Sequence, residues 1–142
     1  ILQDGRSGVV DSFSRSRSSR KVWAGTALCQ GFLLQSLLSM YARTRSVSYI
    51  ARAILNRPTR IYLTQASRIR RLMRNYFGDD WHRVPLSFVL NNPAVSFVPL
   101  GMLSKASIDA NVDIAKIPIE RSRILSFINT LPEEYFVDDI FT

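Results

Sequence analysis

The chain has 142 residues, of which 46% are hydrophobic, and this composition excludes a wholly disordered protein. The length suits one domain with a modest core. The formal net charge is +8. A single cysteine, Cys29, and a single histidine, His82, exclude an internal disulfide and a zinc site built from Cys and His.

The positive charge is concentrated in residues 1–83. They hold 15 Arg and Lys against 4 Asp and Glu, whereas residues 84–142 hold 4 against 7. Of the basic residues, 16 are Arg and 3 are Lys. Because the guanidinium fork binds phosphate through two parallel hydrogen bonds, this bias predicts a polyanion, or an acidic partner surface, for the front half.

Residues 1–21 are rich in Ser, Gly and Arg and show no hydrophobic period, so we expect a loop or an extended arm. The chain begins with Ile1, and we expect a processed product or a piece of a longer protein. The arm is poor in acidic residues, as mitochondrial presequences are, but it shows no clean amphipathic face.

Residues 22–42 carry no charge over 21 positions, which is long enough to cross a bilayer. Polar Gln, Ser and Thr side chains are spread through the segment, and Gly25 and Gly31 lower its helix propensity. We expect one helix over residues 22–42, buried mainly by protein. A membrane-spanning helix is the alternative.

Two basic helices are expected next. In the first, Val47, Ile50 and Ile54 fall at helical spacing, and Pro58 ends it. The second is predicted from "TQASRIRRLMRNYF", with Thr64 as its N-cap and Gly78 as its C-terminal cap.

The second basic helix is expected to be two-sided. Its apolar face consists of Ile69, Leu72, Met73 and Tyr76. Three arginines spaced three apart form a row beside that face, and Arg70 lies on a third side; the row is Arg68, Arg71 and Arg74.

The remaining residues, 84–142, are apolar at first and acidic at the end. Prolines interrupt the apolar part and predict short helices or turns; they are Pro85, Pro93 and Pro99. A helix is expected from about Glu120 to Leu131, followed by an acidic segment that Pro132 initiates. The whole chain is thus predicted to be mainly α, with an arm (1–21), a basic helical region (22–83) and an apolar to acidic helical region packing on it (84–142).

Gly78-Asp79-Asp80 spells the metal-binding signature of viral RNA-copying polymerases. That signature sits in a tight turn between two apolar strands, from which both carboxylates project into the metal site. Here the upstream flank is Arg-rich and has a helical period, and the earlier carboxylates lie in the arm. We therefore interpret the tripeptide as a helix cap and a solvated acidic turn, in which Asp79 and Asp80 pair with Arg74 or Arg83. Asp79 and Asp80 are the metal ligands of the alternative hypothesis, and otherwise no catalytic set or cofactor is expected in this chain.

The run "SRKVWAGTALCQGFLLQSLLSMYARTRSVSYIARAILNRP", residues 19–58, resembles the region between palm and thumb in polymerases of segmented double-stranded RNA viruses, the reovirus-like group. Ser7-Gly8 is similar to the Ser-Gly of their template-handling motif, although Val9, Val10 and Asp11 stand here in place of the Thr and Asn of that motif. The resemblance implies that the catalytic aspartates, with their Mg²⁺ or Mn²⁺, lie in the parent protein outside this chain, in a virion or in host cytoplasm.

Three functions are compatible with the sequence. The first is an RNA-contacting part of a viral RNA-directed RNA polymerase. The second is a structural RNA-binding subunit of a large ribonucleoprotein, such as an organellar ribosome in a mitochondrion. The third is a small subunit of a membrane complex. In the first two, phosphates are held by basic side chains, which position RNA without reading its sequence: Arg43, Arg45, Arg52, Arg57, Arg60, Arg68, Arg70, Arg71 and Arg74.

Overall fold

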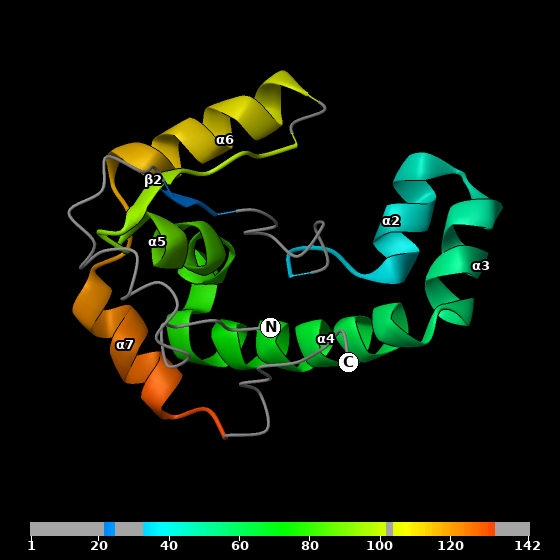
Figure 1. The fold of residues 1–142 in the computed structure, drawn as a ribbon, viewed down its shortest axis with the longest axis horizontal. Coiled ribbons are helices and arrows are strands. Elements are labelled where there is room, and N and C mark those ends of the chain that lie inside the picture. Colours follow the sequence, from blue (N-terminus) through cyan, green and yellow to red (C-terminus); the bar gives the residue numbers. More distant parts are fainter. Residues whose placement is uncertain (1–21, 25–32, 102–103, 133–142) are drawn as a thin grey trace.

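The computed structural model describes residues 22–24, 33–101 and 104–132, and this part of the chain is mainly helical, as expected (Figure 1). Its α-helices are α2 (Leu37–Thr44), α3 (Val47–Leu55), α4 (Arg57–Phe77), α5 (Val84–Leu90), α6 (Lys105–Lys116) and α7 (Arg121–Asn129). A 3-10 helix, η2 (Gly78–Arg83), joins α4 to α5. Two short strands, β1 (Val22–Trp23) and β2 (Val95–Phe97), pair in parallel.

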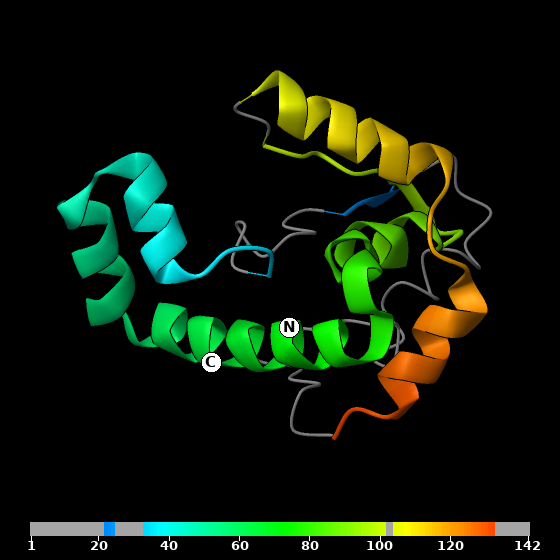
Figure 2. The ribbon, with the colours of Figure 1, turned by 180° about the vertical axis from the view of Figure 1, so that it is seen from behind.

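The 21-residue helix α4 organises the fold. The α2–α3 hairpin packs near its N-terminal end, whereas η2, α5 and α7 gather at its C-terminal end, and both views show this separation (Figures 1 and 2). The helix starts earlier than the sequence suggested. Asn56 is its N-cap, and the Asn56 Oδ1 accepts hydrogen bonds from the backbone N–H of Thr59 at 3.0 Å and from its hydroxyl at 2.9 Å.

The predicted N-cap role of Thr64 is therefore wrong. Thr64 lies inside α4, where its hydroxyl donates to the Arg60 carbonyl at 3.0 Å. Pro58 occupies the first turn of α4, because a residue without an N–H loses no hydrogen bond there. The predicted end is confirmed: Gly78 caps the helix with φ +58°, and its N–H donates to the Arg74 carbonyl.

A single helix over residues 22–42 is also wrong. Val22 and Trp23 form β1, and the Ala24 N–H donates to the Phe97 carbonyl at 2.9 Å. The helix α2 begins only after Ser36, whose hydroxyl accepts from the Ser39 N–H at 3.1 Å. Aromatic and β-branched residues favour extended backbone, and a Ser with extended backbone starts a helix rather than continuing one. The predicted burial by protein holds in part: Leu33 is buried at 5% exposure, whereas Leu38 in α2 is 77% exposed.

The core lies where α4 meets α7. Buried residues of α4, of α7 and of the chain beside them form one apolar cluster: Leu33, Ala66, Ile69, Met73, Phe77, Val84, Ile119, Ile124, Phe127, Ile128 and Leu131. The rings of Phe77 and Phe127 meet edge to face with centroids 5.2 Å apart. The predicted apolar face of α4 is confirmed at Ile69 and Met73, both 2% exposed, while Tyr76 at its border is 41% exposed.

The second half of the chain contains short helices, as the prolines predicted, and α7 confirms the helix expected near residues 120–131. The strand β2 was not predicted. It has only three residues, and its partner β1 lies about 70 positions earlier in the chain. None of the helices described here combines the length and the apolar character that a membrane span requires.

Candidate nucleic-acid interface

The solvent-facing side of α4 is lined with arginines. At 100° per residue, Arg57, Arg60, Arg68 and Arg71 fall within an arc of roughly 80° on the helix. All four are exposed, and the buried residues Ala66, Ile69 and Met73 lie on the opposite side. Because the core holds one face of α4, the arginine face is fixed toward solvent. We call these four residues the arginine face.

The early start of α4 is what unites this surface. The sequence pattern placed Arg57 and Arg60 before the second basic helix and the row of Arg68 and Arg71 within it. The signal for one continuous helix was present in Asn56-Arg57-Pro58, which reads as N-cap, first and second helical positions. From Arg57 to Arg71 the face then extends over about 21 Å, at 1.5 Å per residue.

The arginine face has no carboxylate beside it among the residues described. The helix α4 contains no Asp or Glu. The ion pairs found in residues 22–24, 33–101 and 104–132 lie elsewhere, between Asp80 and Arg83, Lys105 and Asp109, and Lys116 and Asp113. Arginines three apart on a helix repel each other by a few tenths of a kcal/mol per pair, so the arrangement costs stability unless an anion faces it.

Arg70 and Arg74 of α4 have internal roles, and Arg60, although exposed, also donates to the Ile54 carbonyl at 3.2 Å. The Arg74 guanidinium lies over the Trp81 ring, 4.4 Å from its centroid, so it packs against η2. Arg70 is on a third side, as expected. It donates to the Gln35 carbonyl at 2.7 Å, and burial, with Arg74 as a smaller cause, lowers its pKa. Arg70 therefore attaches the residues that precede α2 to α4.

Of the other arginines predicted to contact RNA, Arg45 is described with its side chain, whereas Arg43 and Arg52 are described by their backbone alone. Arg45 is exposed and adopts φ +53° at the end of α2, where its N–H donates to the Tyr41 carbonyl at 2.8 Å. The backbones of Arg43 and Arg52 lie in α2 and α3, but their side chains are outside the described part of the structure. One cation was not foreseen: the Arg123 guanidinium of α7 lies 5.1 Å from the Phe77 ring centroid.

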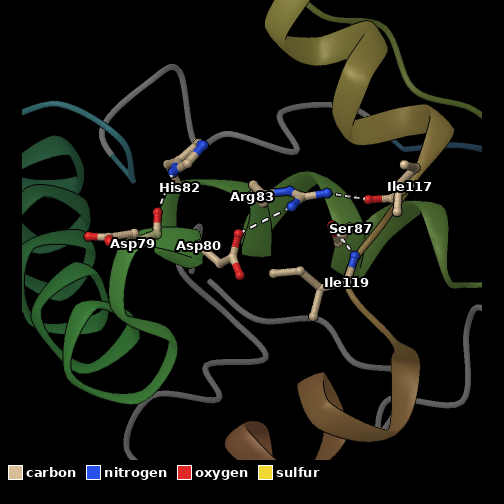
Figure 3. Close-up of polar contacts among 7 residues, drawn as sticks. All are labelled: Asp79, Asp80, His82, Arg83, Ser87, Ile117 and Ile119. Atoms are coloured by element: carbon tan, nitrogen blue, oxygen red, sulfur yellow. Dashed lines mark hydrogen bonds and ion pairs between the residues drawn. The ribbon is translucent and has the colours of Figure 1, made fainter.

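The Gly78-Asp79-Asp80 turn is part of η2 and not of a strand hairpin (Figure 3). The predicted pairing is confirmed for Asp80, whose Oδ1 accepts from Arg83 at 3.1 Å. The Asp79 carbonyl accepts a hydrogen bond from His82 Nδ1 at 2.8 Å. Among the residues described, no three His, Cys, Asp or Glu side chains are grouped as a metal site requires.

Figure 3 also shows that Arg83 reaches in the opposite direction, where its second nitrogen donates to the Ile117 carbonyl at the end of α6. Arg83 thus links the acidic turn to the C-terminal half of the protein, which gives it a structural role.

Comparison with families of proteins, with characterised proteins and with solved structures found no match to this chain. The fold defines a mainly helical protein with one strongly basic exposed helix face, and that face is the candidate functional site.

Proposed function

We propose that the arginine face of α4 binds the phosphate backbone of RNA without reading its sequence. The observation that carries the proposal is the alignment of Arg57, Arg60, Arg68 and Arg71 on one exposed side of a helix that has no acidic residue. The guanidinium group matches phosphate geometry and is weakly hydrated, so it gives up water readily on contact. A phosphate row facing these residues replaces their mutual repulsion with attraction.

The setting we propose is a viral RNA-directed RNA polymerase, in which this chain holds template or product while the catalytic residues and their Mg²⁺ or Mn²⁺ lie elsewhere in the parent protein. This part of the proposal is supported only by the resemblance of residues 19–58. The helix expected there is interrupted at residues 22–24 and 33–36, so the local structure adds no support to it.

The test is a salt titration of RNA affinity with two charge-matched variants. Arg68→Gln with Arg71→Gln removes two charges from the arginine face. Lys105→Gln with Lys116→Gln removes two exposed charges from α6. Each lost phosphate contact should flatten the plot of log affinity against log salt by roughly 0.7 on single-stranded RNA. The arginine variant should therefore lose about 1.4 in slope, equally for RNAs of unrelated sequence, and the lysine variant should lose none.

Equal slopes for the two variants and the unchanged protein would remove the RNA role. Binding of an acidic polypeptide that is lost in the arginine variant, with RNA binding unchanged, would instead assign the face to a protein partner.

A further inference from the structure

The α2–α3 hairpin exposes apolar side chains that the rest of the described structure does not cover. On α3, Val47, Ala51 and Ile54 share one face at helical spacing, and all three are exposed. Val47 is 66% exposed, and Leu55 at the end of the helix is 78% exposed. A helix whose apolar face points to solvent requires a covering partner.

Cations border this apolar face. The Arg60 guanidinium donates to the Ile54 carbonyl at 3.2 Å, which places its charge at the C-terminal end of α3. Arg45 is exposed at the turn between α2 and α3, and Arg57 is exposed just beyond α3. No Asp or Glu occurs from residue 12 to residue 78. A bare polyanion would satisfy the cations and leave the apolar side chains in water, so the complementary ligand combines carboxylates with apolar groups.

This chain contains a segment with that composition. Residues 133–142, "EEYFVDDIFT", hold four carboxylates and five large apolar side chains, and they lie outside the described residues. The segment follows Leu131, which is buried in the cluster that includes Met73 of α4. From Met73 to Arg57 the helix measures about 24 Å. Ten extended residues reach about 33 Å, which is enough to arrive at α3.

We propose that the exposed apolar and basic surface of the α2–α3 hairpin binds the acidic, aromatic segment 133–142 of the same chain. Covalent attachment keeps the segment at a high effective concentration. Since Arg57 and Arg60 belong both to this surface and to the arginine face, the bound segment competes with RNA. This docking goes beyond the proposed function and does not depend on it.

The direct test places a benzophenone amino acid at Phe141 of the full chain and maps the products of photocrosslinking by mass spectrometry. The expected products join residue 141 to positions within residues 38–60 of the same molecule. A benzophenone at Leu125, an exposed position on α7, is the control and should not give them. Products that join residue 141 mainly to α7 or to the C-terminal half of α4, or that arise between molecules, would overturn the proposal.

A second variant tests whether the crosslink depends on the apolar side chains of the α2–α3 hairpin or only on the short distance between the hairpin and residue 141. Leu38→Ser, Val47→Ser and Leu55→Ser together change side chains that are all more than half exposed, so the fold should survive, which circular dichroism verifies. The crosslink yield should fall several-fold. The single change Ile117→Ser, at a 72% exposed position on the opposite end of the molecule, should leave it unchanged. An unchanged yield in the triple variant would contradict a specific surface.

Competition is measured with Glu133→Gln, Glu134→Gln, Asp138→Asn and Asp139→Asn in one chain. RNA affinity should rise if the segment covers Arg57 and Arg60, and an unchanged affinity would refute the competition. Intramolecular crosslinks in a chain that binds no RNA would leave the docking proposal standing and remove the proposed function, so the two failures can be told apart.

Discussion

The buried hydroxyl of Ser87 accepts a hydrogen bond from the backbone N–H of Ile119 over 3.0 Å, and so attaches α5 to the connection between α6 and α7. Asn91, one turn further along, donates to the Ile119 carbonyl at 2.7 Å. Both backbone groups of Ile119 are therefore satisfied by side chains that α5 and its C-cap supply. This arrangement keeps Ile119 in the core.

Ser87→Ala should lower the free energy of unfolding by about 1–3 kcal/mol, because it leaves the buried Ile119 N–H without an acceptor. Chemical denaturation followed by circular dichroism measures the change. The control is Ser126→Ala on the exposed side of α7, which should stay within about 0.5 kcal/mol of the unchanged protein. Equal effects of the two substitutions would contradict the assigned role of Ser87.

Asn56→Ala should destabilise the protein by about 1 kcal/mol, because the first turn of α4 loses its side-chain cap. Asn75→Ala is a control at the other end, since Asn75 is exposed in the last turn of the same helix. There the change improves helix propensity, so stability should be unchanged or slightly higher. An unchanged free energy of unfolding in Asn56→Ala would mean that Asn56 does not cap α4. The helix would then begin later, as the prediction of Thr64 as N-cap implied.

Gly78→Ala should cost about 1–3 kcal/mol of stability, because the residue has φ +58°, where a side chain is strained. The cost comes from the backbone alone, since an added Cβ would meet no atom within 4 Å. Gly101→Ala also places its Cβ in open space and does so without a positive φ, so it should have little effect. Thermal unfolding of the two variants compares these positions directly.

Titration with Mn²⁺, followed by electron paramagnetic resonance, should reveal no site that depends on Asp79 and Asp80. The Asp80 carboxylate is engaged by Arg83, and both residues lie in a 3-10 helix that follows a basic helix. A catalytic metal pair needs rigid carboxylates that converge from different elements. Stoichiometric Mn²⁺ binding that is lost in Asp79→Asn with Asp80→Asn would contradict this prediction and restore the polymerase interpretation of the tripeptide.

Local periodicity was enough to predict several features of this protein. The apolar spacing of Val47, Ile50 and Ile54 indicated α3, and Gly78 was predicted as a helix cap. The separation of Arg68 and Arg71 from Ile69 and Met73 also follows from 3.6 residues per turn, whatever the helix packs against. For that reason the basic face of α4, on which the proposed function rests, was largely visible in the sequence.

Tertiary structure decided the features that depend on distant partners. Val22 and Trp23 are extended because they pair with β2, and no pattern near residue 22 specifies that strand. Arg70 resembles its neighbours in the sequence, but the carbonyl of Gln35 holds it on the inner side of α4. Ser87 is indistinguishable from a surface serine until Ile119 folds against it. Residues within one helical turn of each other determine a helix and its faces. Strand pairing and buried polar contacts instead join residues about 30 to 70 positions apart in this chain. Only the packed chain brings those residues together.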